Sequence, residues 1–220
     1  MSGSTLVLDA STYTASVALV EGDTLLRERA VAMRDPRHER LMPAVAELLG
    51  DRGMRDIARI VCGAGPGSFT SLRIAASIAK GLAVASGKPL FAISSLALLV
   101  AGTEAPLVEG RWLALLDAMR AESFAQLFEV SGGKISEASE LRVVRDEEIA
   151  ALARTMRAQT IGKGRDVDSA PHARGMLRLG AHPALRSRVD LPSWEPDYGR
   201  LAEAQVRWEA THGRPLSERS

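Results

Sequence analysis

The fold of this 220-residue chain is decided by one stretch, Gly63-Ala64-Gly65-Pro66-Gly67-Ser68-Phe69-Thr70-Ser71-Leu72-Arg73-Ile74. It follows the apolar run Ile60-Val61-Cys62, which predicts the end of a buried strand, and it leads into the long apolar segment Leu72–Val84. We therefore expect a glycine-dense turn between a strand and a helix. Glycines allow backbone torsions that other residues avoid, and they let a second backbone or a ligand come close.

Two interpretations of this turn remain open from local sequence. Ser68 or Thr70 is a natural N-cap for the helix that follows. Unpaired amides at a capped helix start behind a glycine turn form a potential anion site. The alternative is a tight turn with a purely structural role, because short glycine motifs are common.

The composition limits the class of protein. The chain is 46% hydrophobic but only 4% aromatic, which predicts a sizeable core built from aliphatic side chains. The net charge of +1 gives no electrostatic argument for nucleic-acid binding by this chain alone. The single cysteine, Cys62, excludes an internal disulfide, and its apolar surroundings predict a buried, inert thiol.

The sequence also predicts a cytoplasmic location. The start of the chain, Met1–Thr5, has no basic stretch before an apolar one, which is unlike a secretory signal. The longest apolar segment, Leu72–Val84, is interrupted by Arg73 and Lys80 and is too short to cross a bilayer. We expect no contact with a membrane.

Periodicity predicts an α/β fold in the first half of the chain. The expected strands are Leu6–Asp9, Ala15–Val20, Leu25–Val31, Arg59–Cys62 and Leu90–Ile93, and the expected helices are His38–Leu49, Thr70–Ser86 and Ser95–Ala101. Three hairpin-linked strands followed by α/β units indicate a mixed sheet with helices on its faces. The order is similar to that of the ribonuclease H-like unit found in actin, the heat-shock chaperones and sugar kinases.

The second half of the sequence is a weaker copy of the first. Leu113–Ala118 echoes Leu6–Ala10, so that Asp117 follows Asp9 at a spacing of 108 residues. We expect two related lobes, residues 1–103 and residues 104–220, with the second the more degenerate because its glycine turn is missing. The expected elements of the second lobe are strands at Ser123–Glu129 and Gln159–Gly162 and helices at Glu147–Ala158, Met176–Leu179 and Ala202–Glu209.

Several motifs together resemble one family. Gly65–Ile74 is similar to the GPGSFTGLRIG signature of the TsaB (YeaZ) family, with Ser71 where that family usually has glycine. Leu8–Thr12 resembles its LDTST start and His38–Pro43 its H-x-x-x-L-x-P segment. Asp117–Glu122 resembles its DARMGEVY stretch. The resemblance is strong from Leu6 to about Leu99 and thin beyond Val130.

This resemblance implies a non-catalytic subunit in the threonylcarbamoylation of adenosine 37 in tRNAs that read codons beginning with A. The implied partners are a TsaD-type transferase and a TsaE-type ATPase, with a homodimer as a further possibility. The tRNA, and ATP or ADP, would be met only through the complex. The main alternative is a kinase-like or ATPase-like enzyme of the actin superfamily, and a metallopeptidase relative is a weaker one.

The resemblance to actin-like folds also implies candidate phosphate-binding residues. In those folds a strand-ending aspartate and a Ser/Thr hairpin hold a metal-bound phosphate. The matching nucleotide- or anion-binding residues are Asp9, Ser11, Thr12, Gly65, Gly67 and Ser68. The structural alternative is that Asp9 and the hydroxyls satisfy local backbone groups.

We expect neither a metal site nor a catalytic residue. The four histidines, His38, His172, His182 and His212, form no H-x-x-x-H pair on one helix. The TsaD-type paralogue carries such a pair. The sequence also lacks a G-x-S-x-G nucleophile elbow.

The Thr70–Ser86 helix is the best candidate for a partner contact. Its alanines line one face and Ile74, Ile78 and Leu82 line another, so it must be covered on more than one side. Burial within the fold and contact with another protein both remain open. In the TsaB family this helix and the His38–Leu49 helix meet the transferase or a second copy. The implied interface residues are His38, Leu41, Met42, Val45, Leu72, Ala75, Ala76, Ala79 and Ala83.

Overall fold

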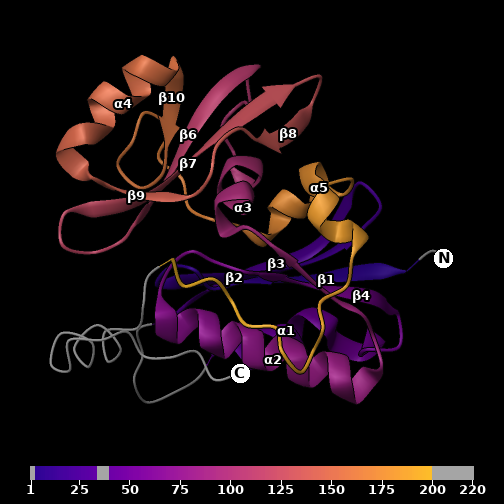
Figure 1. Cartoon of the computed structure of the whole chain (residues 1–220). Helices are drawn as coiled ribbons and strands as arrows, with labels where there is room; N and C mark the ends of the chain where they lie inside the picture. The colour runs from indigo at the N-terminus through magenta and orange to yellow at the C-terminus, as the bar shows by residue number, and fades with distance from the viewer. Residues whose placement is uncertain (1–2, 34–39, 200–220) are drawn as a thin grey trace, which may run out of the picture.

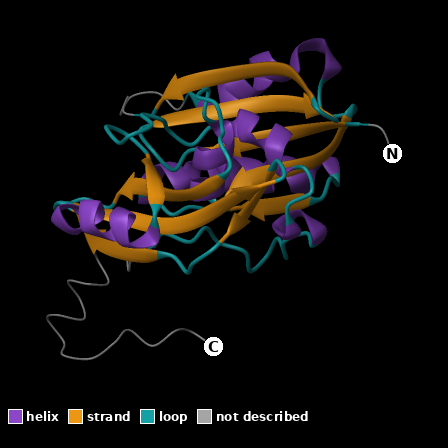
Figure 2. Cartoon of the chain, turned by 90° about the horizontal axis from the view of Figure 1, so that it is seen from above, coloured by secondary structure: helices purple, strands orange, loops and turns teal. Residues whose placement is uncertain are grey.

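The computed structural model describes residues 3–33 and 40–199. They form two sheets with helices beneath, between and above them (Figure 1). In the view from above, helices lie among and outside the strands and do not form a separate bundle (Figure 2). The predicted α/β class with two mixed sheets flanked by helices is confirmed.

The first sheet has the strand order β3-β2-β1-β4-β5. Its strands are β1 (Ser4–Asp9), β2 (Thr14–Glu21), β3 (Thr24–Ala32), β4 (Ile57–Gly63) and β5 (Leu90–Ile93). β1 pairs antiparallel with β2, β2 antiparallel with β3, and β4 lies parallel to both β1 and β5. This is the order of a ribonuclease H-like unit, and every strand predicted in this half is present.

The second sheet repeats this plan in part. Its strands are β6 (Gly110–Asp117), β7 (Glu122–Ser131), β8 (Lys134–Glu137), β9 (Arg142–Arg145) and β10 (Ala158–Ile161). The order β10-β6-β7-β8 matches β4-β1-β2-β3, and β6 and β10 are parallel as β1 and β4 are. The predicted repeat is therefore confirmed, although β8 and β9 were not predicted.

One expectation about the second lobe was wrong. Gly162 and Gly164 follow β10 at the position that the glycine turn occupies after β4. A Cβ at Gly162 would collide with the backbone carbonyl of Leu115, so this turn also brings two backbones together. What the described second lobe lacks is a long helix after the turn.

The helices form layers around the two sheets. α1 (Leu41–Leu49) and α2 (Phe69–Ser86) cover one face of the first sheet, and α3 (Ser95–Gly102) lies between the two sheets (Figure 1). α4 (Ile149–Met156) covers the outer face of the second sheet. Short 3-10 turns at 50–52, 146–148, 173–175 and 183–186 and the short helix α5 (Met176–Leu179) complete the fold.

Alternation along β1 explains this layering. Leu6 and Leu8 pack in the core with α1 and α2, whereas Val7 packs in the core that contains α3. Side chains of a strand point alternately to its two faces, so a strand covered on both sides must be apolar throughout. β1 is covered in this way, because all six of its residues are buried; its central residues Leu6–Leu8 are apolar, and its polar residues lie at its two ends.

Several predicted helix boundaries need correction. The predicted helix Glu147–Ala158 begins as the 3-10 turn at 146–148, and α4 ends at Met156 because Arg157 takes a left-handed conformation and Ala158 enters β10. Ser68 is at the N-cap of α2, but its side chain makes no cap hydrogen bond. His38 and the predicted helix Ala202–Glu209 lie outside the described residues.

The last described part of the chain returns to the first sheet. The 3-10 turn at 173–175 contacts β1, β2 and β3, and the turn at 183–186 contacts β5. The Val189 N–H then donates to the Leu90 carbonyl of β5 at 2.9 Å. The division into residues 1–103 and 104–220 stays a prediction. In the described ranges, no helix combines the length and apolar character needed to span a membrane.

Candidate functional site

Asp9, the last residue of β1, is a buried carboxylate with 1% of its surface exposed. Its Oδ1 accepts hydrogen bonds from the backbone N–H and the hydroxyl of Ser11, at 3.0 and 2.7 Å. Its Oδ2 accepts one from the Ser95 hydroxyl at 2.6 Å. Burial raises the pKa of Asp9, and the hydrogen bonds from Ser95 and Ser11 partly oppose that shift. Both carboxylate oxygens are therefore occupied by donors of the protein itself.

Ser95, the first residue of α3, joins Asp9 to the glycine turn. Its hydroxyl oxygen accepts the Gly65 N–H at 3.1 Å, and its own N–H donates to the Gly65 carbonyl at 2.8 Å. The turn needs its glycines for close approach: a Cβ at Gly63 would collide with Asp9 Oδ2, and one at Gly67 with the Ser11 carbonyl. The turn was predicted correctly from the sequence, but the contact of Ser95 was not, since a serine at a helix start does not indicate a distant partner.

The chain itself also covers the outer side of this turn. The Asp197 N–H donates to the Ala64 carbonyl at 2.7 Å, and the Asp197 carbonyl packs where a Cβ of Gly65 would stand. The Tyr198 ring lies 4.5 Å from the Phe69 ring at the start of α2. Gly199 packs against the ring of Phe124 in β7, so this segment passes from the first lobe to the second.

The structure brings the predicted anion-binding residues together but uses many of their donors internally. The Ser68 N–H donates to the Ser11 carbonyl at 2.7 Å, and the Thr12 hydroxyl donates to the Thr14 carbonyl at 2.9 Å. The Gly65 N–H is held by Ser95, and Gly67 lies against the Ser11 backbone. This arrangement favours the structural interpretation of the turn, and a nucleotide or anion site there stays a prediction.

The described residues offer no other obvious reactive group. Within 3–33 and 40–199, no three His, Cys, Asp or Glu side chains are grouped closely enough to hold a metal ion. Cys62 is fully buried in β4, and burial, with the nearby Asp9, raises the pKa of its thiol far above its usual range. A protonated, enclosed thiol is a core side chain, as the sequence predicted.

The structure turns most of the predicted interface residues inward. Residues with at most 1% of their surface exposed are Leu41, Val45, Leu72, Ala75, Ala79 and Ala83. Ala76 is 6% exposed, Met42 is 38% exposed, and His38 lies outside the described residues. A partner therefore cannot reach the alanine face of α2 without opening the first lobe. Sequence alone could not choose between the two apolar faces of this helix.

The other apolar row of α2, Ile74, Ile78 and Leu82, is half-buried and lies along the edge of its outward side. A groove of about 520 Å³ runs along it, lined by Phe69, Thr70, Arg73, Ile74, Ser77 and Ile78. Phe69 is 39% exposed, and Val84, further along the helix, is 71% exposed. The guanidinium of Arg73 lies 5.3 Å from the centre of the Phe69 ring, which gives the groove one cationic end.

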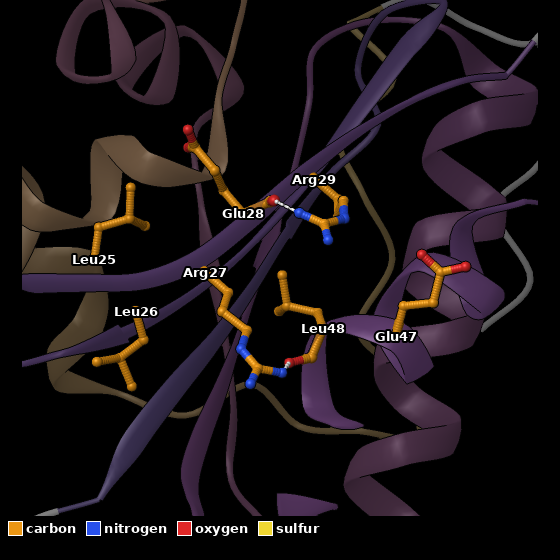
Figure 3. Close-up of a pocket in the computed structure, with 7 residues that line it drawn as sticks. All are labelled: Leu25, Leu26, Arg27, Glu28, Arg29, Glu47 and Leu48. Carbon is orange, nitrogen blue, oxygen red and sulfur yellow. Dashed lines mark hydrogen bonds between the residues drawn. The ribbon is translucent and has the colours of Figure 1, made fainter. Parts of the chain in front are cut away.

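A second hollow of about 430 Å³ lies between β3 and α1 (Figure 3). It is lined by Leu25, Leu26, Arg27, Glu28, Arg29, Glu47 and Leu48. Arg27 donates to the Leu48 carbonyl at 3.2 Å, so this guanidinium is already used to close the end of α1. The two arginines and two glutamates balance in charge, and the hollow therefore indicates no particular class of ligand.

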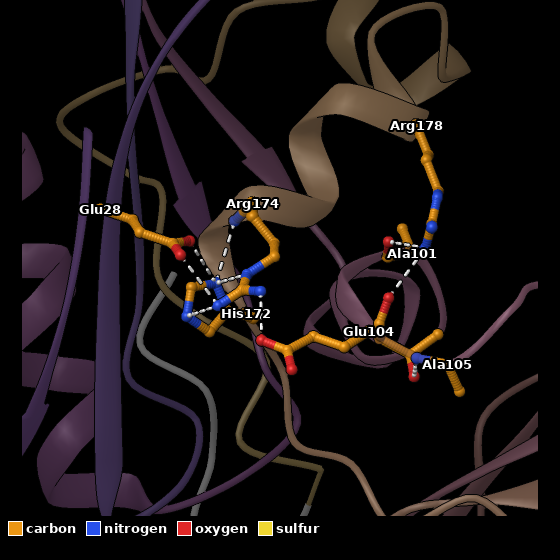
Figure 4. Close-up of polar contacts among 8 residues, drawn as sticks. Glu28, Ala101, Glu104, Ala105, His172, Arg174 and Arg178 are labelled. Carbon is orange, nitrogen blue, oxygen red and sulfur yellow. Dashed lines mark hydrogen bonds and ion pairs between the residues drawn. The ribbon is translucent and has the colours of Figure 1, made fainter. Parts of the chain in front are cut away.

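A polar cluster ties the connection between the lobes to the edge of the first sheet (Figure 4). Arg174 pairs with Glu28 of β3 at 3.0 Å and with Glu104, and its Nε donates to His172 Nδ1 at 3.2 Å. Arg178 donates to the Ala101 carbonyl at 2.8 Å. Burial and the nearby Arg174 cation lower the pKa of His172, so its imidazole is held neutral. These contacts join residues that are far apart in the chain, so no local sequence pattern predicts them.

The repeated strand order, with an aspartate ending the first strand of each sheet, defines a two-lobed protein with ribonuclease H-like lobes. Residues 33–173 match the family model described as TsaD, tRNA N6-adenosine threonylcarbamoyltransferase. The tRNA threonylcarbamoyladenosine biosynthesis protein TsaB of Bacillus subtilis is 30% identical, and the match covers 92% of this chain and 96% of that protein. The chain belongs to the TsaB (YeaZ) family.

Further relatives agree with this assignment. TsaB of Escherichia coli is 33% identical over 54% of this chain and 52% of its own length. The solved structure of YeaZ from Pseudomonas aeruginosa superposes with a TM-score of 0.74 and 27% identity, over 89% of this chain and 99% of that one. The predicted family resemblance is therefore confirmed.

Proposed function

We propose that this chain is a non-catalytic subunit of tRNA threonylcarbamoyladenosine biosynthesis and that it pairs with a TsaD-type transferase. Membership of the TsaB family supports the pathway. The observation that carries the pairing is the apolar surface along α2, made of exposed Phe69 and Val84 and of a groove beside half-buried Ile74 and Ile78. Apolar side chains gathered in a groove on one helix are typical of a protein-binding surface.

The state of Asp9 supports the non-catalytic role. Both of its oxygens accept hydrogen bonds from Ser11 and Ser95, and the amide of Ser68 is bound to the Ser11 carbonyl. A carboxylate this buried, with both oxygens already accepting hydrogen bonds from the protein, is poorly placed to bind a metal ion or a water. We expect the isolated chain to transfer no threonylcarbamoyl group and to hydrolyse no ATP at a meaningful rate. ATP turnover by the isolated chain that Asp9→Ala abolishes would contradict this.

The remaining partners follow from the same assignment. The complex would include a TsaE-type ATPase, would meet tRNA, and would act in the cytoplasm on adenosine 37. The chain would hold no cofactor of its own and would meet ATP or ADP only through the complex. The same face of α2 would serve a second copy of the chain where the transferase is absent.

Charge placed on the outward row of α2 tests the pairing. Ile78→Glu and Val84→Glu each put a carboxylate into the proposed contact, where an unpaired charge costs about 3 kcal/mol or more of association, or roughly a hundredfold in Kd. Binding to the transferase subunit is measured by calorimetry, with circular dichroism to confirm folding. Val84 is 71% exposed, so its substitution leaves the core untouched.

Val108→Glu is the matched control, because Val108 is an exposed valine (53%) in the connection between the lobes. It should bind the transferase as the wild type does. Wild-type affinity in both folded α2 variants would place the interface elsewhere.

A further inference from the structure

Four exposed arginines meet at the C-terminal end of α4, on the outer side of the second lobe. Arg154 lies in the last turn of this helix and Arg157 directly follows it. Arg111 of β6 donates to the Met156 carbonyl at 3.3 Å, and Arg142 of β9 donates to the Met156 sulfur at 3.6 Å. Strands β6 and β9 and helix α4 therefore bring these cations to one place, which we call the arginine patch.

The arginine patch carries an excess of positive charge. Across the described ranges, no carboxylate lies within ion-pair distance of any of its four guanidinium groups, whereas Arg145 at the other end of α4 pairs with Glu147 at 3.6 Å. The nearby acids are Glu129, which lies opposite Arg111 in the β6–β7 register, Glu140, two residues before Arg142, and Glu109, two residues before Arg111, whose carboxylate accepts the N–H groups of Gly132 and Gly133. Four cations against three acids leave the surface slightly basic, although the whole chain is almost neutral.

Capping of α4 accounts for only part of this arrangement. Cations near a helix C-terminus interact favourably with its dipole, and Arg111 satisfies one terminal carbonyl. Arg157, however, has a φ of 51°, a left-handed conformation in which glycine is the usual residue. An exposed arginine at a position that favours glycine indicates that the charge itself is used.

We propose that the arginine patch binds the phosphate backbone of the tRNA on which the complex acts. This inference rests on the proposed function and assigns one of its partners to a surface of this chain. Guanidinium groups bind phosphate oxygens through paired N–H donors, and such contacts hold a nucleic acid in register without reading its sequence. α4 and α2 lie at opposite ends of the molecule, so the transferase and the RNA can bind at the same time (Figure 1).

The test measures binding of an unmodified tRNA transcript to the full chain, alone and with its transferase partner, over a range of salt concentrations. The patch variant is Arg111→Gln, Arg142→Gln and Arg154→Gln together. We expect its Kd to rise several-fold and the slope of log K against log salt to fall by about one for each phosphate that the variant no longer binds. The matched control is Arg52→Gln, Arg186→Gln and Arg188→Gln, which removes the same charge from exposed positions outside the second sheet and should change neither quantity.

Arg157→Gly separates binding from stability. Glycine suits the left-handed conformation, so this variant should melt at the same temperature as the wild type or higher and still bind RNA more weakly. Unchanged RNA affinity in the patch variants, equal losses in patch and control variants, or no RNA binding by the wild type would overturn the proposal. Transferase binding is followed in parallel: its absence in the wild type would instead overturn the proposed function.

Discussion

The aspartates that end the first strands of the two lobes stand in very different surroundings. Asp9 is 1% exposed and accepts hydrogen bonds from Ser11 and Ser95. Asp117 is exposed, and its Oδ1 accepts the Met119 N–H at 2.7 Å within its own hairpin. The strand order around them is the same, so topology alone does not decide whether such a residue is enclosed.

The segments that follow the fourth strand of each lobe make the difference. After β4, the glycine turn and α2 fold back over Asp9, and α3 then supplies Ser95. After β10, the turn at Gly162 leads into 3-10 turns and the short helix α5. Asp9 pairs with Ser16 across its hairpin, and Asp117 pairs with Ser123 across the other. The hairpin after Asp117 is therefore one residue shorter. The two lobes therefore share the aspartate at the end of the first strand, but only the first lobe has the segments that enclose it.

The largest effect should come from closing the glycine turn of the first lobe. Gly67 has a φ of 155°, and Gly67→Ala places a Cβ against the Ser11 carbonyl. Because the colliding atom belongs to the backbone, the clash cannot be relieved by a side-chain rotation. We expect a loss of about 4 kcal/mol or more in the free energy of unfolding. Urea denaturation measures it. The control is Gly81→Ala in α2, where nothing lies within 4 Å and alanine should stabilise the helix by up to about 1 kcal/mol.

The next effect compares the two aspartates directly. Asp9→Asn replaces a buried acceptor with an amide whose NH2 faces the donors of Ser11 or Ser95, so we expect a loss of about 2 kcal/mol in the free energy of unfolding. Asp117→Asn leaves an exposed acceptor for the Met119 N–H and should change that free energy by less than about 0.5 kcal/mol. Similar losses in both variants, measured by urea denaturation, would contradict the contrast between the lobes.

The pH dependence of the Asp9→Asn effect provides a separate prediction. Burial raises the pKa of Asp9 in the folded protein, so the unfolded chain releases this proton first as the pH rises from about 4. The stability that protonated Asp9 supports is present below that pH and is lost as the pH rises through the folded pKa. The asparagine variant has no such titration. The difference in free energy of unfolding between the wild type and the asparagine variant should therefore shrink as the pH rises. If that difference grew with pH instead, the pKa of Asp9 would be lowered in the folded protein.

The strands and helices near the glycine turn were predictable because their signals are local. β4, the turn and α2 combine an apolar run, three glycines and a helical period within thirty residues of chain. β8 and β9 were missed because each has only four residues, and exposed positions outnumber buried ones in both. A short strand at a partly exposed position carries little hydrophobic pattern.

The site was less predictable because it depends on contacts between distant segments. Nothing in the sequence shows that Ser95 reaches Asp9 or that Asp197 covers Gly65. Which face of α2 is buried was equally hidden, because Ala79 and Ile78 each lie in an apolar row and only the sheet decides between them. The sequence predicted two apolar faces on α2, and in the structure the alanine face is the one that is fully buried.

The smallest effect concerns the hairpins themselves. Met119, Arg120 and Ala121 all have φ values between 58° and 66°, whereas the described non-glycine residues with positive φ include none in the hairpin after Asp9. Ala121→Gly removes a left-handed penalty of about 1 kcal/mol but adds freedom to the unfolded chain, so we expect the free energy of unfolding to rise by about 0.5 kcal/mol.

Thr12→Gly is the comparison in the other hairpin. It also adds freedom to the unfolded chain, but it relieves no left-handed residue and loses the hydrogen bond from the Thr12 hydroxyl to the Thr14 carbonyl. It should therefore lower the free energy of unfolding by about 1 kcal/mol. Opposite signs in thermal denaturation would support the view that the shorter hairpin is the strained one, because it must turn in fewer residues. A loss of stability in both variants would show that the left-handed residues of the second lobe are held without strain.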